Sequence, residues 1–165
     1  MSCLDVFGRI MICDKIDLEN IKINLESKDS EECIAELLEV IVKKNPTVDR
    51  KEVLNSLIAR EDEMSTAIYP FIAIPHAVCK SIDKTTIAIG VSPSGIVFEN
   101  PNSPKKENLK VNVIFEILFE ENDTVGRLHI LRDILQIVSN SEFINQICLA
   151  KSSQEVLNLI SSFEI

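Results

Sequence analysis

Several features that would assign this chain of 165 residues to a particular class of protein are absent or scarce. It has no tryptophan, one tyrosine and four glycines, and it contains no run of about 18 uncharged apolar residues that could span a bilayer. The first twenty residues have one early cation, Arg9, and no small-residue cleavage pattern, so they make a poor secretion signal. We therefore expect a cytoplasmic protein that does not insert directly into a membrane.

Positive charge is scarce as well, because 17 Lys and Arg residues face 26 Asp and Glu residues and leave a net charge of −9. Nonspecific nucleic-acid binding needs a cationic surface that displaces counterions, so we expect no nucleic-acid partner. The five cysteines are scattered without a CxxC pair, which argues against a zinc ribbon or a redox motif. With only two histidines besides, the ligand count also argues against a metal site.

Apolar residues at helical spacing predict helices in the first third and the last third of the chain. Asp29 and Asp49 each precede a glutamate by three residues, which is the spacing of a capping box, and an apolar stripe follows both. Two short helices are expected over 142–149 and 153–162 near the C-terminus. Before them we expect a helix whose buried face is formed by Leu128, Leu131, Leu135 and Val138.

Between these helices the chain is rich in Ile, Val and Phe, with expected strands over 20–25, 71–75, 85–91, 96–98 and 111–119. Few of them alternate cleanly between apolar and polar residues, which is typical of strands covered on both faces. The turn-forming residues between 92 and 110 predict a hairpin-like excursion. We therefore predict an α/β (α+β) fold in a single domain over 17–165, with a central mixed β-sheet flanked by helices on both faces, after an N-terminal extension over 1–16.

The two histidines lie in different settings. His76 follows Pro75 at the end of the apolar run IAIPH, and because proline has no N–H, the sheet ladder is expected to end there. His129 comes directly after Leu128, at the edge of the buried face of its expected helix. No HExxH or GxSxG motif accompanies either histidine. An isolated histidine near an apolar surface is most often structural, so spacing alone leaves the function open.

The segment REDEMSTAIYPFIAIPHA, from Arg60 to Ala77, resembles an active-site signature. The signature is that of the enzyme IIA domains of the bacterial phosphoenolpyruvate-dependent sugar phosphotransferase system, in the fructose, mannitol and nitrogen-regulatory class. In that family a helix ends in an Arg-Glu pair, a Ser/Pro-Thr step follows, and a strand reads Ile-Ala-Ile/Val-Pro-His. The matching residues here are Arg60-Glu61, Ser65-Thr66 and Ile72-Ala73-Ile74-Pro75-His76.

A second histidine of that family opens a helix in a His-Ile/Leu-x-x-Leu context, and His129, 53 residues after His76, resembles it. The whole resemblance covers roughly residues 17–162. One departure lies before the strand, where nitrogen-regulatory members usually have glycine-rich sequence and this chain has Ala67, Tyr69, Pro70 and Phe71. Such residues do not take positive φ angles cheaply, so this loop is expected to follow another path or to be stiffer.

The resemblance implies that His76 is the phosphoryl acceptor. It implies that His129 donates a hydrogen bond to the phosphoryl oxygens or orients His76. Arg60 is the first candidate to bind those oxygens, because a guanidinium matches the geometry of a phosphate. Thr66 is a candidate to donate its hydroxyl hydrogen to the phosphoryl group or to the imidazole. Which ring nitrogen of His76 reacts is left open.

Simpler roles stand beside two of these. Arg60 is alternatively an exposed helix-end residue paired with Glu61 or Glu63, a kind of pair that contributes under about 1 kcal/mol. Thr66 alternatively caps its loop through local backbone bonding. Around His76 a shallow apolar rim is expected for docking another protein, with local candidates Phe71, Ile74, Ala77 and Val78.

The function implied by the resemblance is that of a phosphocarrier. A histidine-containing phosphocarrier protein is the implied donor, and a IIB component that serves sugar uptake is the implied acceptor. No cofactor or metal is needed, because the donor already carries an activated phosphoryl group. The alternative is a stand-alone nitrogen-type regulatory protein that controls target proteins by its phosphorylation state, and a third possibility is a histidine that is retained and unused.

Overall fold

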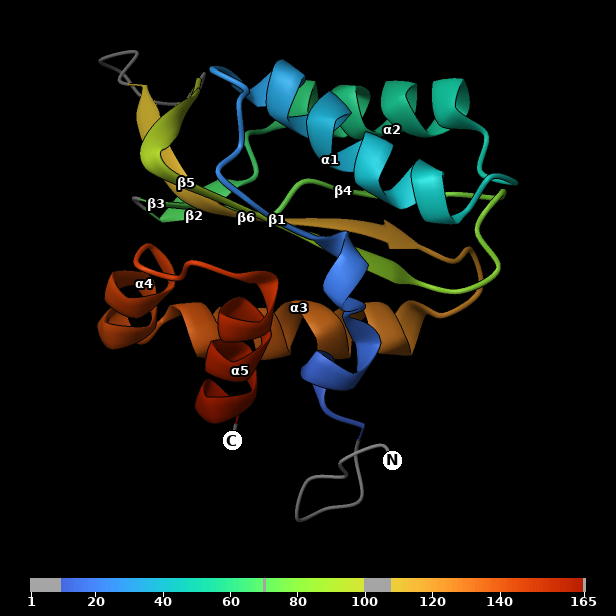
Figure 1. Cartoon of the computed structure of the whole chain (residues 1–165). Coiled ribbons are helices and arrows are strands. Elements are labelled where there is room, and N and C mark those ends of the chain that lie inside the picture. Colours follow the sequence, from blue (N-terminus) through green and yellow to red (C-terminus); the bar gives the residue numbers. More distant parts are fainter. Residues whose placement is uncertain (1–9, 70, 100–107, 165) are drawn as a thin grey trace.

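The computed structural model describes residues 10–69, 71–99 and 108–164. In this part of the chain a six-stranded sheet lies between two layers of helices (Figure 1). One layer is formed by α1 (Ser30–Lys44) and α2 (Arg50–Glu63), and the other by α3 (Thr124–Val138), α4 (Ser141–Ile147) and α5 (Ser153–Phe163). The prediction of one domain, with a mixed sheet flanked by helices on both faces, is confirmed.

The sheet is ordered β1 (Ile21–Ile23), β5 (Thr86–Phe98), β6 (Leu109–Phe119), β3 (Phe71–Ala73) and β2 (Ala67–Tyr69). A sixth strand, β4 (His76–Val78), pairs with β6 alone and lies end to end with β3 along the same side of β6. Strands β5 and β6 are antiparallel, as are β2 and β3, whereas β1–β5, β3–β6 and β4–β6 are parallel. The sheet therefore has an edge at β4.

Strand β6 explains why the strand segments show no clean alternation. Phe115, Ile117 and Phe119 pack into the core beneath α3, α4 and α5. Ile114 and Leu118, on the opposite side of the strand, pack into the core beneath α1 and α2. Because both faces of the sheet are covered, eight of the eleven positions of this strand are apolar.

The expected capping boxes form. Asp29 Oδ1 accepts a hydrogen bond from the Glu32 amide at 2.9 Å, and Asp49 Oδ1 accepts one from the Glu52 amide at 3.1 Å. These side chains satisfy amides of the first helical turn that have no partner within the helix. They fix where α1 and α2 begin. The C-terminal end of α2 lies at the edge of the sheet.

The prediction that the sheet ladder ends at His76 is wrong. The ladder breaks two residues earlier, at Ile74 and Pro75, and resumes in β4, where His76 lies opposite Ile117. Proline lacks only its N–H, and the Pro75 carbonyl still accepts a hydrogen bond from the Ile117 amide at 2.9 Å. Pairing with β6 can therefore continue past the proline.

The region around residues 67–98 differs from expectation in two further ways. The stretch from Ser92 to Gly95 does not separate two strands; it lies within β5 and appears as a register shift between Val91 and Ile96. Phe71 adopts a φ of 87°, so this segment takes a positive φ angle without a glycine. A non-glycine residue in that region is strained, and it lies where β3 changes register against β6.

The buried face predicted for α3 is wrong in two of its four members, whereas Val138 is buried and Leu131 is partly buried against the core. Ile130, Ile134 and Ile137 face the core, whereas Leu128 is 64% exposed and Leu135 is 42% exposed. Both sets repeat at helical spacing, so periodicity could not choose between them. The leucine side of this helix instead faces the region of His76.

Part of the expected N-terminal extension packs on the domain. Ile12 and Ile16 are buried in the core beneath α3 and α5, and the Glu164 carboxylate accepts hydrogen bonds from the Ile12 and Cys13 amides. Residues 1–9 lie outside the described residues, and the boundary at residue 17 stays a prediction. No helix within the described ranges combines the length and the apolar character needed to cross a membrane.

Candidate active site

His76 lies at the start of the edge strand β4, with one ring nitrogen held by the backbone. Its Nδ1 is 2.8 Å from the Ile74 carbonyl oxygen. A carbonyl can only accept a hydrogen bond, so Nδ1 carries the hydrogen and Nε2 keeps its lone pair. The ring meets Phe119 edge to face, with 6.0 Å between centroids and an interplanar angle of 73°. These two contacts fix both the tautomer and the plane of the imidazole.

The surroundings keep this imidazole neutral. Burial lowers the pKa of His76 below its ordinary 6.5, and the positive charge of Arg60 lowers it further. The hydrogen bond to Ile74 and the charge of Glu61 oppose this effect without reversing it. Near neutral pH the ring therefore has a free lone pair on Nε2, which is the state that a nucleophile requires.

A hollow of about 550 Å³ lies at His76, where α2, β4, β6 and α3 meet. Its lining combines apolar side chains with two guanidinium groups and one carboxylate. The residues that line it are Ser56, Ala59, Arg60, Glu63, His76, Ala77, Val78, Phe119, Thr124, Arg127, Leu128 and Leu131. An adjoining hollow of about 410 Å³ shares Arg60, His76 and Leu131 with it and adds Thr66 and Leu135.

Arg60, one of the predicted site residues, is brought to His76. It lies in the last turn of α2 and donates a hydrogen bond from Nη1 to the Met64 carbonyl at 2.8 Å. Among the described residues it forms no ion pair with Glu61 or Glu63, so the alternative role that we considered for it is not seen. Its charge is free to meet an anion in the hollow.

Thr66 is brought near His76 too, with its hydroxyl already engaged. The Thr66 Oγ1 donates to Glu61 Oε2 at 2.6 Å, and the Thr66 amide donates to Glu61 Oε1 at 3.0 Å. The Ser65 hydroxyl also donates to Glu61 Oε1, at 3.2 Å. This geometry matches the loop-holding alternative, and donation by Thr66 to a phosphoryl group stays a prediction.

Glu61 thereby starts a chain of hydrogen bonds that ends on the imidazole. It holds Thr66; the Thr66 carbonyl accepts from the Ile74 amide at 3.1 Å, and the Ile74 carbonyl accepts from His76 Nδ1. The Ile74 carbonyl is available because the ladder is interrupted at this residue. The sequence marked Glu61 as part of a motif and as an alternative partner of Arg60, and this positioning role emerges only from the fold.

His129 is not brought to this group. It is exposed on α3 and lines neither of the two hollows at His76. Arg127, two positions earlier, lines the larger one. Two positions along a helix are separated by about 200° of rotation, so both cannot face the same hollow. The clue in the sequence was that Arg127 and Leu131 are four residues apart and share a face, whereas His129 is off that face.

The start of α3 is tightly built around a glycine. Asp123 Oδ1 caps the helix by accepting from the Gly126 amide at 2.9 Å. A Cβ atom at Gly126 would lie 1.9 Å from Asp123 Oδ2, so any side chain at this position would have to displace the Asp123 carboxylate. The Asp123 cap therefore occupies space that a side chain at Gly126 would need.

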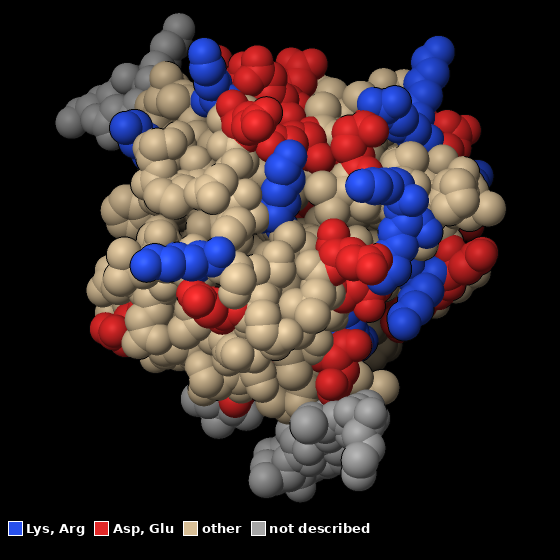
Figure 2. All heavy atoms as spheres, in the orientation of Figure 1, with Lys and Arg blue, Asp and Glu red and all other residues tan. Residues whose placement is uncertain are grey.

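The expected apolar rim is only partly correct. Ile74 and Ala77 are buried in the core, whereas Phe71 and Val78 are exposed. Other exposed apolar side chains that line the two hollows lie outside that expectation: Met64, Ile68, Leu128 and Leu135. On the face shown in Figure 2, acidic and basic side chains lie intermingled beside broad uncharged areas.

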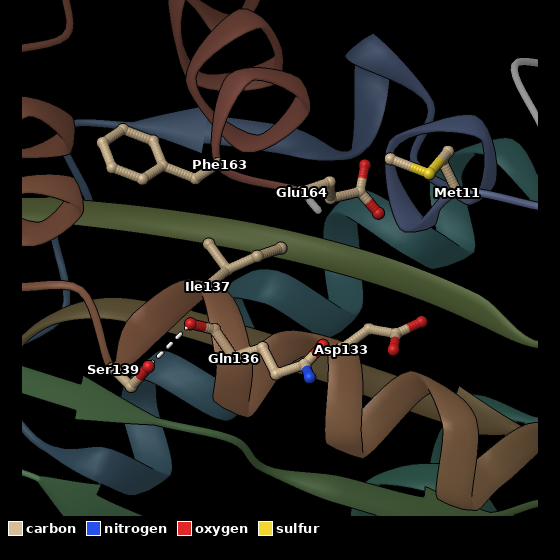
Figure 3. A pocket seen from close by; sticks show the side chains of 7 residues that line it. All are labelled: Met11, Asp133, Gln136, Ile137, Ser139, Phe163 and Glu164. Carbon is tan, nitrogen blue, oxygen red and sulfur yellow. Dashed lines mark hydrogen bonds between the residues drawn. The ribbon is translucent and has the colours of Figure 1, made fainter. Parts of the chain in front are cut away.

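Another hollow, of about 340 Å³, lies between α3 and the two ends of the described chain (Figure 3). Its lining holds the carboxylates of Asp133 and Glu164 but no histidine, cysteine or lysine. Glu164 is engaged with backbone amides of the N-terminal segment, and Asp133 pairs with Arg132 at 3.0 Å. Within the described ranges no three His, Cys, Asp or Glu side chains gather as metal ligands.

Glu116, in the middle of β6, is the most unusual side chain away from these hollows. It is fully buried beneath α1 and α2, and neither carboxyl oxygen has a hydrogen-bond partner among the described residues. Burial raises its pKa well above the ordinary value. The carboxyl is therefore held as the neutral acid across an extended pH range.

Comparison with known proteins accords with this geometry. A model of the family described as "Phosphoenolpyruvate-dependent sugar phosphotransferase system, EIIA 2" matches residues 14–163. The fructose-specific EIIABC component of the phosphotransferase system from Bacillus subtilis (strain 168) is 28% identical over 153 residues. That alignment takes in 93% of this chain and 23% of the Bacillus protein, so the chain spans less than a quarter of this relative.

Two solved structures share the fold. The nitrogen regulatory protein IIA-Ntr from Neisseria meningitidis has a TM-score of 0.78 at 21% identity, covering 90% of this chain and 98% of its own. The complex of enzyme IIAMTL and phosphorylated enzyme IIBMTL from Escherichia coli has a chain with a TM-score of 0.73 at 20% identity, with the same two coverages. At these identities the likeness establishes the fold and leaves the choice of partner open.

Proposed function

The chain belongs to the EIIA 2 family of the phosphoenolpyruvate-dependent sugar phosphotransferase system, and on that premise we propose that His76 accepts a phosphoryl group and passes it on. The observation that carries the proposal is the held imidazole. Nδ1 is bonded to the Ile74 carbonyl, which leaves Nε2 as the reactive nitrogen. His76 lines a hollow with a free guanidinium, so a nucleophile and a cation for the phosphoryl oxygens come together.

The transfer balances without an added acid or base. The lone pair of Nε2 forms a bond to phosphorus while the P–N bond of the donor phosphohistidine breaks, and the electron pair of that bond returns to the donor ring. The hydrogen on Nδ1 stays in place, where the Ile74 carbonyl stabilises the positive charge that develops on the ring. Arg60 stabilises the charge spread over the phosphoryl oxygens.

The donor in this proposal is a histidine-containing phosphocarrier protein and the acceptor is a IIB component that serves sugar uptake, both in the cytoplasm. Support for a IIB partner comes from the related IIAMTL fold, which is known in complex with phosphorylated IIBMTL. The exposed apolar side chains around the hollows, such as Val78 and Leu128, suit docking of a protein. A fructose-specific protein among the curated relatives also favours transport.

A second candidate is regulation of target proteins by the phosphorylation state. The observation that favours it is the structural likeness to the nitrogen regulatory protein from Neisseria meningitidis. Both candidates share the phosphorylated His76 and differ in the fate of its phosphoryl group. If the labelled chain passes its phosphate to a purified IIB component, the first candidate holds; if it keeps the phosphate beside active IIB components, the second does.

The decisive experiment is phosphorylation of the purified chain with ³²P-labelled phosphoenolpyruvate, enzyme I and the histidine-containing carrier. We expect one acid-labile phosphate per chain, mapped to His76, with the ³¹P resonance of an Nε2-phosphorylated imidazole. A known IIA protein serves as the positive control. No label in this chain beside a labelled control, or label that persists in His76→Gln, would overturn the proposal.

A further inference from the structure

We propose that Arg127 is a second guanidinium that binds the phosphoryl group on His76, opposite Arg60. The inference rests on the function proposed above and adds a residue that the sequence pattern did not indicate. Arg127 lies in the first turn of α3 and lines the same hollow as His76 and Arg60. Since α2 and α3 cover opposite faces of the sheet, the two arginines reach this hollow from opposite helical layers (Figure 1).

The hydrogen bonding of Arg127 is incomplete. Its Nη2 reaches the Glu121 carbonyl at 3.3 Å and the Thr124 hydroxyl at 3.5 Å, both at the long end of hydrogen-bond distances. Its Nε is buried and has no acceptor among the described residues. A guanidinium has five N–H groups in a planar fork that fits the oxygens of a phosphate. The unsatisfied Nε–H is therefore a donor that a phosphoryl oxygen in the hollow can complete.

The charge of Arg127 is also unpaired. Among the described residues, neither Arg127 nor Arg60 forms an ion pair, although the whole chain has a net charge of −9. By contrast, Arg50 pairs with Glu39 and Arg132 with Asp133.

Glu63 lines the hollow as well, but it is exposed and pairs with neither Arg127 nor Arg60. A phosphoryl group carries close to two negative charges. Two free guanidinium groups that line one hollow with a neutral imidazole are complementary to that charge.

Arg127 and His129 make different demands on α3. The hollow is lined by Arg127, Leu128 and Leu131, whereas His129 is exposed and off this lining. For His129 to reach the phosphoryl group, the first turns of the helix would have to rotate. Such a rotation would carry Arg127 away from the hollow. One substitution at each position therefore separates the two assignments.

The test compares Arg127→Gln and Arg127→Lys with Arg132→Gln, a matched loss of an arginine from the same helix outside the hollow. The first readout is the rate of phosphate transfer from the phosphorylated carrier to each variant. We expect Arg127→Gln to slow transfer about 10- to 100-fold, Arg127→Lys to recover part of the rate, and Arg132→Gln to stay within about twofold of the unchanged chain.

A second readout needs no partner protein. Phosphoramidate phosphorylates histidine directly: the Nε2–P bond forms, the P–N bond of the reagent breaks, and ammonia leaves. In the chain loaded this way, the Nε–H resonance of Arg127 should move downfield relative to the unloaded chain. This signature is read in the unaltered protein, so it decides the matter even if Arg127→Gln folds poorly.

The outcomes separate this inference from the proposed function. If the unaltered chain takes no phosphate from the carrier, the proposed function fails, and the chemically loaded chain still tests Arg127. Suppose that the unaltered chain takes phosphate normally, that Arg127→Gln is within twofold of it, and that the Arg127 Nε–H resonance of the unaltered chain does not move on loading. The role of Arg127 is then overturned, while the proposed function stands. A slow His129→Gln beside a normal Arg127→Gln would overturn it as well, in favour of His129.

Discussion

The edge of the sheet at His76 and its centre at Glu116 are close in the fold and opposite in character. Ile117 of β6 lies opposite His76, and Glu116 is its immediate neighbour on the other face. Both regions leave polar groups without partners among the described residues: Arg127 Nε at the edge and both Glu116 oxygens at the centre. At the edge, the hollow is open to a ligand and is lined by the charged side chains of two arginines. At the centre, the Glu116 carboxyl is closed off from any ligand and is neutral.

This contrast shows how an unsatisfied polar group is to be interpreted. Leaving such a group buried costs about 1–3 kcal/mol wherever it occurs. A ligand that fills the hollow can offset the cost at Arg127, whereas Glu116 imposes it permanently. Accessibility to a partner therefore separates a functional group from a destabilising one, and substitutions in the two regions test that separation.

The largest expected difference lies in phosphate transfer. His76→Gln removes the nucleophile and should lower the transfer rate by about a thousandfold or more, to the background of the assay. Glu116→Gln keeps the shape of the buried side chain and should leave the rate within about twofold. Both are measured with ³²P-labelled carrier. A large loss of rate in Glu116→Gln would show that the centre of the sheet serves the chemistry, which would break the contrast.

The next effect concerns the hydrogen-bond chain that ends on His76. Glu61→Ala removes the acceptor of three hydrogen bonds from Ser65 and Thr66 and should lower the free energy of unfolding by about 2–4 kcal/mol. Because the Ile74 carbonyl would then be less well held, transfer should slow by about tenfold. The measurements are urea unfolding and single-turnover transfer. Asp62→Ala, at the exposed neighbouring position, is the control and should change the unfolding free energy by about 0.5 kcal/mol or less.

The third effect is the dependence of stability on pH caused by Glu116. Its pKa is raised in the folded state, so the acid is protonated in both states below the unfolded value near 4.5. As the pH rises above that value, only the unfolded state releases its proton, and stability falls by about 1.4 kcal/mol per pH unit until the folded-state pKa is reached. Glu116→Gln should abolish this slope, as measured by urea unfolding between pH 5 and pH 8. Equal slopes in the two proteins would contradict the burial of the carboxyl as a neutral acid.

Glu36 is the matched control with the opposite sign. Burial opposes its ionisation, but hydrogen bonds from Glu26, Ser27 and Lys22 prevail and lower its pKa to about 2. Its contribution to stability is therefore present above the unfolded value near 4.5 and is lost as the pH falls toward 2. Glu36→Gln should destabilise the protein at pH 7 and hardly at all at pH 2.

The smallest effect is a shift in the titration of His76. Burial and Arg60 both lower its pKa, so its ring proton signals in nuclear magnetic resonance should titrate below pH 6.5. Arg60→Gln removes one of these causes and should move the midpoint upward. The transfer rate should accordingly stay flat as the pH falls from 8 to 6.5 and decline below that range. A midpoint above 6.5 in the unaltered chain would show that the ring is not held in the way described.

Capping-box spacing and apolar patterning predicted the layered fold well, because caps and strands depend mainly on residues that are close in the sequence. They failed on α3, where Leu128–Leu131–Leu135 and Ile130–Ile134–Ile137 repeat at the same period. Only the position of the sheet decides which set is buried. The ladder that resumes after Pro75 was missed for a related reason, since pairing depends on the carbonyl of Pro75 and on β6, distant in the sequence.

The site was predicted in part. The context of His76 and Arg60 came from a resemblance in contiguous sequence, and the fold brings both to one hollow. Arg127 is 67 residues from Arg60 in the sequence, and no local pattern links them; the edge of the sheet does. The engagement of Thr66 with Glu61 was likewise hidden, because which acceptor a hydroxyl selects depends on the path of the loop.

The glycine at the start of α3 has a consequence for how this protein can vary. Every substitution at Gly126, even the smallest, would displace the Asp123 carboxylate from the end of the helix and disturb the turn that contains Arg127. In a saturation mutagenesis screen for phosphate transfer, this position should tolerate fewer substitutions than the exposed positions of the same helix. A residue with no side chain would then be constrained by the capping carboxylate for which it leaves room.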